Sequence, residues 1–152
     1  MTLLLSLLIG VVAGLRAMTA PAAVAWAASL GVIDVSNTPL AFMGYQWTPW
    51  IFTVLAIVEL VTDQLPSTPS RKVPVQFGTR LVIGALTGAT IGAAANDLLV
   101  ALVAGVIGAL VGTLGGAAAR GKLAASFGKD RPAAIIEDAV AIIGAILIMA
   151  AA

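Results

Sequence analysis

Residues 98–119 read LLVALVAGVIGALVGTLGGAAA, an apolar run in which no side chain carries a charge. A helix that spans the hydrocarbon core of a bilayer needs about 20 residues of this kind. The run therefore predicts a transmembrane helix, and the C-terminal stretch 132–152 predicts another of similar length.

Other apolar stretches precede this run, at residues 3–30, 50–65 and 81–95. The second reaches spanning length if its helix starts near Trp47, and the third if its helix starts near Val75. Hydrophobic residues make up 61% of the 152-residue chain and charged residues 10%, with a mean hydropathy of +1.09. A soluble domain of this size has too much surface to hide so many apolar side chains. We expect an all-α integral membrane protein with about five transmembrane segments, forming a single domain over residues 1–152.

The stretch 3–30 is too long for one ordinary span and too short for two. Gly14-Leu15-Arg16 and Pro21 interrupt it near its middle. It predicts either one long kinked span or a re-entrant pair of half-helices that meet near Arg16 to Pro21. A broken helix is tolerated at membrane depth only where protein or a water-filled cavity satisfies the freed backbone groups. Both interpretations therefore place this segment inside the bundle.

Along the chain, basic loops alternate with loops that contain no Lys or Arg. Loops 66–79 and 120–131 are basic, whereas loop 31–48 and the turn Asn96-Asp97 contain no Lys or Arg. By the positive-inside rule the basic loops face the cytoplasm and the C-terminus faces out. The N-terminus is inside if the first stretch spans once, and outside if it is re-entrant. We expect a multi-pass protein of the inner-membrane type, with an aromatic belt near its outer interface formed by Trp26, Tyr45, Trp47 and Trp50.

The chain has no Cys and no His. Their absence from the sequence excludes disulfides, thiol catalysis, Cys/His zinc sites and the usual His general base. The sequence also has no basic patch with interleaved aromatic residues, so we expect no nucleic-acid partner. We expect no cofactor, no metal and no enzymatic activity. The enzymatic alternative is a set of carboxylates that holds Mg²⁺ for phosphoryl chemistry.

Glycines recur every fourth residue in several of the apolar stretches. This spacing places them on one helix face, where the missing Cβ lets two backbones approach closely. The short turn Asn96-Asp97 predicts an antiparallel hairpin of its flanking helices, which the glycines could pack. Alternatively, one set faces a second subunit. Since the longer sets exceed what one hairpin needs, we expect a homodimer. The sets are Gly84, Gly88 and Gly92; Gly108, Gly112 and Gly116; and Gly10 with Gly14.

Ionisable side chains within the apolar stretches mark a candidate site. Glu59 and Asp63 are four residues apart and share one helix face. Charged groups in a membrane are costly unless paired, and they mark functional sites by default. We expect these charges to converge on one layer, with Arg16 as the deepest cation. The predicted substrate- or ion-binding residues are Arg16, Thr19, Glu59, Asp63, Arg80, Glu137 and Asp138.

The charges of this layer do not balance. Four carboxylates face the two guanidiniums of Arg16 and Arg80, which gives a net charge of −2 if all are ionised. Arg71 and Arg131 could compensate from the loops; otherwise a carboxylate stays protonated or a cation binds. Neighbours on a helix diverge by about 100°, so we expect that Glu137 and the adjacent Asp138 do not face the same partner. A set of purely structural salt bridges is the alternative to a binding site.

Several motifs resemble a known family. They are GLRAMTAP at 14–21, VELVTD at 58–63 followed by LPSTPSR at 65–71, and Arg131-Pro132 with the later EDAVA at 137–141. The chain resembles, over nearly its whole length, the bacterial membrane proteins of domain-of-unknown-function family 4126. The resemblance implies a small multi-pass protein and no assigned activity. Its motifs coincide with the intramembrane charges.

Two functions follow from this pattern. The first is a small transporter or channel-like protein, in which an ion or small charged solute meets the charged layer beside the broken helix. The second is a lipid-binding or membrane-organising protein without transport, in which Arg16, Arg71 and Arg80 hold an anionic headgroup. Membrane lipid is an expected partner in both.

Overall fold

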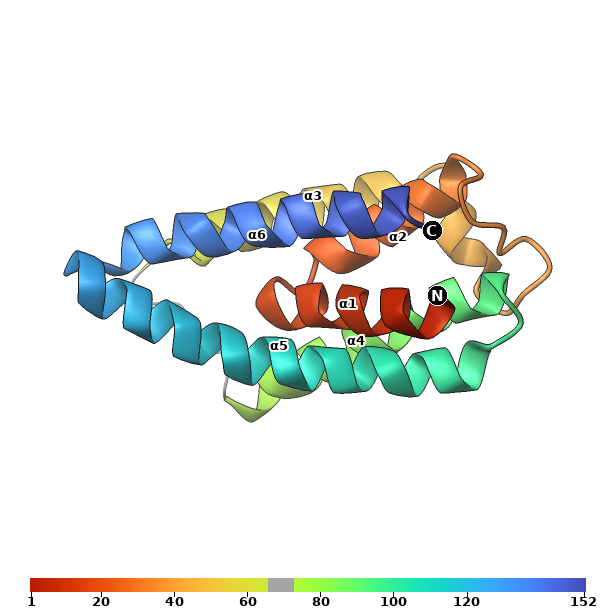
Figure 1. Ribbon diagram of the computed structural model, residues 1–152. Helices are drawn as coiled ribbons and strands as arrows, with labels where there is room; N and C mark the ends of the chain where they lie inside the picture. The colour runs from red at the N-terminus through yellow and green to blue at the C-terminus, as the bar shows by residue number, and fades with distance from the viewer. Residues whose placement is uncertain (66–72) are drawn as a thin grey trace.

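The computed structural model describes residues 1–65 and 73–152, and all its regular elements are helices (Figure 1). This confirms the all-α class. The basic residues Arg71 and Lys72 lie outside the described residues. The elements are α1 (Thr2–Leu15), α2 (Thr19–Ser29), the short 3-10 helix η1 (Ala41–Gly44), α3 (Thr48–Thr62), α4 (Pro74–Ala94), α5 (Leu98–Phe127) and α6 (Asp130–Ala150).

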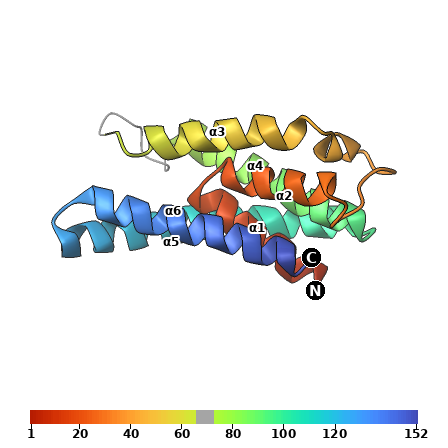
Figure 2. The same cartoon turned by 90° about the horizontal axis from the view of Figure 1, so that it is seen from above.

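The first apolar stretch forms two half-helices that run in opposite directions. The backbone of Arg16 is extended, with φ −139° and ψ 109°, and ends α1. The chain then turns, and α2 returns toward the end of the molecule that holds both termini (Figures 1 and 2). The tip of this hairpin lies inside the bundle, since the side chain of Arg16 is fully buried. The single kinked helix is therefore wrong, and the pair of half-helices is what forms.

Within the described residues, three helices are long and apolar enough to cross a membrane: α4, α5 and α6. The half-helix α1, with 14 residues, and α3, with 15, are shorter than a span. Helix α3 starts at Thr48, next to the predicted Trp47, but it ends at Thr62, and Pro66 follows closely in the sequence. By length and composition the chain is thus a membrane-type helical protein with three candidate spans.

Helix α5 is longer than predicted. It continues from the apolar run through Phe127, so most of the predicted loop 120–131 is helical. The reason is local: residues 120–127 contain mainly good helix formers and no Pro. Gly128, with φ +71°, ends the helix in the left-handed conformation that glycine adopts without strain. Helix α6 begins two residues later, and Arg120 therefore projects from a helix and not from a loop.

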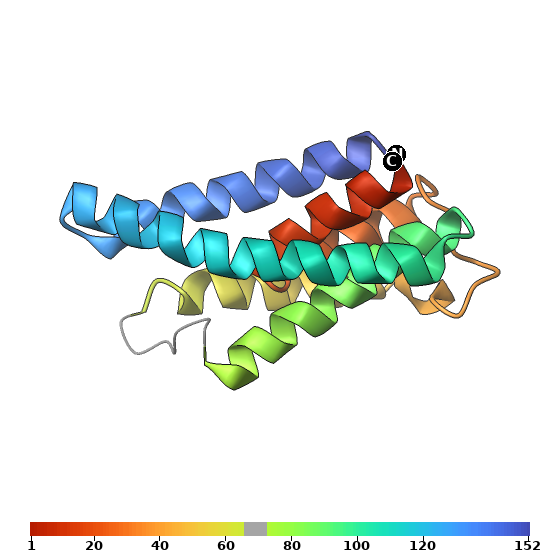
Figure 3. The same cartoon turned by 60° about the horizontal axis from the view of Figure 1, so that its bottom comes forward.

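Backbone contacts between glycines hold α1, α4 and α5 together. Figure 3 shows α5 lying across both α1 and α4. A Cβ added at Gly105 would lie 2.1 Å from the carbonyl oxygen of Gly84, and one added at Gly108 would lie 2.0 Å from that of Leu7. No side chain fits such spaces. Because Gly108 and its neighbour Gly112 pack on α1, they no longer argue for a second subunit, and the homodimer stays a prediction.

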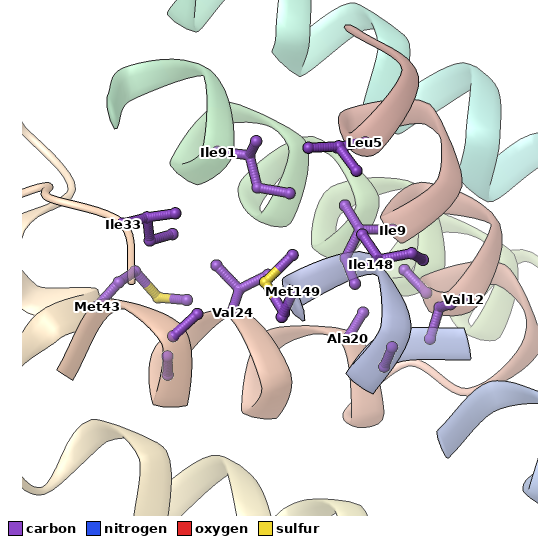
Figure 4. Close-up of a cluster of buried hydrophobic side chains, with 14 of the residues drawn as sticks. Leu5, Ile9, Val12, Ala20, Val24, Ile33, Met43, Ile91, Ile148 and Met149 are labelled. Carbon is purple, nitrogen blue, oxygen red and sulfur yellow. The ribbon is translucent and has the colours of Figure 1, made fainter. Parts of the chain in front are cut away.

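The apolar core lies toward the end that holds both termini. It joins α1, α2 and α6 to the connection after α2, where the side chains of Ile33 and Met43 are buried (Figure 4). Helix α3 is peripheral, with only Pro49 and Ala56 buried. Large apolar side chains along α3, α5 and α6 are exposed, as a lipid environment permits.

The tryptophan and tyrosine residues also gather at this end of the molecule. The rings of Trp26 and Trp50 meet edge to face, with centroids 5.0 Å apart. The indole Nε1 of Trp26 donates to Oγ1 of Thr53 at 3.0 Å. Tyr45 and Trp47 are exposed. The basic α5–α6 junction lies at the opposite end (Figure 1). This arrangement fits the predicted orientation, which itself stays a prediction.

Candidate functional site

The side chain of Arg16 projects from the tip of the α1–α2 hairpin and is fully buried. Its Nη1 lies 2.5 Å from Oδ2 of Asp63, at the end of α3. On α6, its Nε donates to Oδ1 of Asp138, and its Nη2 lies 3.7 Å from Oε2 of Glu137. One guanidinium thus connects the hairpin to both α3 and α6.

The adjacent residues Glu137 and Asp138 both face this guanidinium, so the prediction that they would have different partners is wrong. That expectation assumed a partner with a single point of contact. A guanidinium is a flat group with N–H donors on several edges. Its different nitrogens reach two carboxylates that diverge around the helix.

The carboxylate of Glu59 binds the backbone between the two half-helices. Its Oε1 accepts a hydrogen bond from the amide of Ala17 at 2.8 Å, and its Oε2 accepts one from the amide of Met18 at 2.8 Å. Both amides precede α2, where helix N–H groups lack intrahelical partners and the helix dipole favours a negative charge. Glu59 therefore occupies the place that a bound anion takes in other helix N-termini.

Arg80 of α4 contacts the end of α1, on the other side of the break, and its side chain is almost fully buried. Its Nη1 donates to the carbonyl oxygen of Gly14 at 2.9 Å, and its Nη2 lies 3.6 Å from Oε1 of Glu59. The hydroxyl of Thr113 also reaches the Gly14 oxygen, at 3.5 Å. The last turn of α1 and the start of α2 are thus satisfied by side chains, as a helix break at membrane depth requires.

Arg120 joins the same layer, although residues 120–131 were expected to form a loop. Its Nε and Nη2 donate to the carboxylate of Asp130 at 2.9 and 2.6 Å. Its Nη1 lies 3.4 Å from Oε2 of Glu137, and its Nη2 donates to the carbonyl oxygen of Asp63 at 3.3 Å. One signal could have found it: Arg120 follows Gly116 by four residues and continues the spacing of the glycines on that helix face.

Gln64 is a second residue that sequence reasoning missed. It lies just after α3, and its Nε2 donates to Oδ2 of Asp138 at 3.1 Å. Asp138 therefore accepts from both Arg16 and Gln64. Nothing in the apolar pattern marks this residue, because its position depends on how the chain turns after α3.

The predicted ionisable residues come together in one layer, in which Arg16, Arg80 and Glu137 are buried. Four carboxylates (Glu59, Asp63, Glu137, Asp138) face three guanidiniums (Arg16, Arg80, Arg120) among the described residues. Arg120 also pairs with a fifth carboxylate, Asp130. The predicted counter-charge Arg71 lies outside the described residues. Arg131 is exposed.

Thr19 lies outside the ion pairs. The residue is 8% exposed, and its hydroxyl oxygen is buried without a hydrogen-bond partner among the described residues. The same holds for Nη2 of Arg16, whose nearest recorded partner is the Glu137 carboxylate at 3.7 Å. Unmade hydrogen bonds at buried polar atoms are costly. The layer and its surroundings therefore contain buried polar atoms without hydrogen bonds among the described residues.

A small cavity borders the layer between α1, α5 and α6. It encloses about 120 Å³, and its wall is apolar except for Arg120 and Glu137. In the part of the chain that the structure describes, no group of three or more carboxylates is placed to hold a metal ion.

A family model described as "Domain of unknown function (DUF4126)" matches residues 3–152. No curated protein and no solved structure matches the chain. The match covers the half-helix hairpin and every residue of the charged layer.

Proposed function

This chain belongs to the DUF4126 family, and we propose that it is a small membrane transporter or channel-like protein for an ion or small charged solute. One observation carries this proposal: a fully buried Arg16, held at the tip of a half-helix hairpin, faces three carboxylates from other helices. Half-helices that meet inside a bundle beside charged side chains are typical of transporter sites.

Incomplete hydrogen bonding in the layer supports transport over a purely structural network of salt bridges. Buried ion pairs stabilise a fold when their hydrogen bonds are complete. Here Nη2 of Arg16 and the hydroxyl of Thr19 have no hydrogen-bond partner among the described residues. Carboxylates within membranes serve as proton relays, and protonation of Asp63 or Asp138 would weaken its pair with Arg16 and let the layer rearrange.

The lipid-binding alternative needs arginines that can hold an anionic headgroup. Arg16 directs its donors at Asp63 and Asp138, and Arg80 donates to the Gly14 carbonyl oxygen. An anion would have to displace these carboxylate and carbonyl partners. The geometry therefore favours a cationic ligand over an anionic one.

The membrane arrangement completes the proposal. The α1–α2 hairpin and α3 lie in the membrane with the three long helices, which gives about five membrane segments. The basic α5–α6 junction faces the cytoplasm of a bacterial cell, and both termini face outward across the inner membrane. The glycine-packed helices form its rigid part, and the protein works as a homodimer.

Purified protein in liposomes tests the function. We expect wild type to dissipate an imposed proton or cation gradient, read with an internal pH dye or an ion-selective electrode. Asp63→Asn should abolish this flux. The matched control is Asp34→Asn, since Asp34 is exposed, lies far from the layer in sequence and bonds to Ser36. Absence of flux across a broad ion panel, or equal flux in wild type and Asp63→Asn, would reject transport.

A further inference from the structure

The junction between α5 and α6 carries basic side chains that no carboxylate of the described residues neutralises. Lys122, Lys129 and Arg131 are exposed and form no ion pair with the part of the chain that the structure describes. The one acidic residue between positions 119 and 136 is Asp130. Both oxygens of its carboxylate already accept hydrogen bonds from Arg120. The junction therefore presents three positive charges to its surroundings.

The Arg120–Asp130 ion pair also brings these three cations close together. It holds residue 130 of α6 beside residue 120 of α5, with Nη2 of Arg120 2.6 Å from Oδ2 of Asp130. Lys129 and Arg131 flank Asp130 in the sequence, and Lys122 follows Arg120 by two residues. Lysine and arginine side chains are long and can reach a shared anion from different helices. One anionic group at the junction can thus meet cations from both helices.

The length of α5 places the junction at the depth of lipid headgroups. The apolar run 98–119 spans about 33 Å as a helix, which is enough to cross a hydrocarbon core of about 30 Å. Residues 120–127 continue the same helix for about 12 Å, and headgroups occupy about 5–8 Å on each side of the core. The side chain of Phe127, half exposed at the end of α5, adds apolar surface at this level. A lipid offers both a charge and hydrocarbon to such a surface, whereas a free anion offers only the charge.

The rest of the described chain offers an anion no comparable place. At the end of the molecule that holds both termini (Figure 1), the exposed charged side chains are Asp34 and Asp97, and both are acidic. In the charged layer, Arg16 and Arg80 are buried and directed at protein oxygens. An anion can therefore pair with cations at the junction without displacing a partner within the protein.

We propose that the α5–α6 junction binds an anionic phospholipid, whose phosphate pairs with Lys122, Lys129 and Arg131 while its acyl chains lie against the exposed apolar side chains of the same helices. Charge complementarity favours this lipid, because a zwitterionic headgroup carries an ammonium group that the three cations repel. Basic residues next to a membrane helix each strengthen the attraction to anionic lipid about fivefold, which corresponds to about 1 kcal/mol. The site is separate from the charged layer and does not depend on the transport function.

The test compares ligands that separate the headgroup charge from the hydrocarbon chains. Full-length protein in neutral maltoside micelles is titrated with dioctanoyl-phosphatidylglycerol, dioctanoyl-phosphatidylcholine and glycerol 3-phosphate, and calorimetry measures binding after subtraction of protein-free micelles. We expect saturable binding of the phosphatidylglycerol, roughly tenfold or more tighter than that of the phosphatidylcholine. Glycerol 3-phosphate has the anionic group without the chains and should not bind in the same range. Added salt should weaken the phosphatidylglycerol binding, since it screens exposed charges.

Variants of the three exposed residues locate the binding site. Lys122→Gln, Lys129→Gln and Arg131→Gln should each weaken phosphatidylglycerol binding about fivefold, and the triple variant should lose the preference over phosphatidylcholine. Lys122→Arg with Lys129→Arg keeps the charges and should keep the binding. The matched control is Asp97→Asn at the opposite end, which changes the net charge by one and should leave the binding unchanged. Circular dichroism checks that every variant keeps its helix content.

Equal binding of the two phospholipids would overturn the proposal, and so would a preference for phosphatidylglycerol that the triple variant keeps. Binding of glycerol 3-phosphate as tight as that of the lipid would mean a site for free phosphate in place of a lipid site. If Asp97→Asn strengthens the binding as much as Lys122→Gln weakens it, the net charge of the protein attracts the lipid and the junction is not its site.

Discussion

The two halves of this protein are held together by different forces. In the first half, α1, α4 and α5 meet backbone to backbone through glycines, without room for a single methyl group at Gly105 or Gly108. In the second half, α2, α3 and α6 leave an apolar groove between them. Ion pairs of Arg16 with Asp63 and Asp138 join α3 and α6 to the hairpin tip. Close packing has one arrangement, whereas an ion pair weakens when its carboxylate is protonated. Under the proposed transport function we expect the second half to rearrange while the first stays rigid.

Replacement of Arg16 should cause the largest loss of stability, in the half that ion pairs hold together. Arg16→Ala leaves Asp63 and Asp138 buried without their main partner, and loss of one member of a buried ion pair costs about 3–5 kcal/mol. Unfolding in detergent micelles, followed by circular dichroism, measures the loss. Arg16→Met combined with Asp63→Asn and Asp138→Asn should recover much of it, since that variant removes the unpaired charges as well. If Arg16→Ala is as stable as wild type, the ion pairs do not hold the second half in place.

A single added methyl group should destabilise the glycine-packed half, which consists of α1, α4 and α5. Gly105→Ala would place its Cβ 2.1 Å from the Gly84 carbonyl oxygen, and overpacking of this kind costs about 1–3 kcal/mol. Gly115→Ala is the matched control on the same helix, because nothing lies within 4 Å of its added Cβ. Alanine is also the better helix former. The same micelle unfolding assay should show a loss for the first variant and none for the second. Equal stability of both would contradict the glycine packing.

Glu59 should have a smaller and more local effect. Glu59→Gln keeps one oxygen for the amides of Ala17 and Met18 but presents a donor in place of the other. A hydrogen bond to a charged group contributes about 1.5–3 kcal/mol, so we expect a loss at the low end of this range. Hydrogen exchange should show faster exchange of these two amides, while amides in α5 keep their protection. Unchanged exchange at Ala17 and Met18 would mean that Glu59 does not close the hairpin.

Much of the fold follows from the sequence because hydrophobic runs and charges act over short distances along the chain. The apolar stretches predicted helices, and Arg16 with Pro21 predicted the break. Whether this stretch forms a kinked span or a hairpin depends on the helices that surround the tip, and those helices are distant in the sequence. For the same reason the spacing of Gly108 and Gly112 identified a packing face but not its partner, α1.

The site was predictable to the same extent. Its charged members were identified by the cost of burying them, and the structure brings them together. The role of Glu59 was not predictable, since a carboxylate that accepts from two backbone amides has no sequence signal of its own. Thr19 was selected as a hydroxyl at the helix break, yet it lines the apolar groove between α3 and α6 and takes no part in the ion pairs.

Replacement of Arg120 should cause the smallest loss of stability. It also tests whether the exposed or the buried contacts of Arg120 hold the junction between α5 and α6. Its shortest contacts are to Asp130, whose side chain is 62% exposed, and a solvent-exposed ion pair contributes about 0–1 kcal/mol. Its longer contacts are to the buried carboxylate of Glu137 and the carbonyl oxygen of Asp63. If the buried contacts dominate, Arg120→Ala costs about 1 kcal/mol and Asp130→Asn costs less than about half of that. Lys122→Ala, at an exposed position of the same helix, is the control. Equal losses in the Arg120 and Asp130 variants would mean that the exposed pair alone holds α5 to α6, and that Arg120 takes no part in the charged layer.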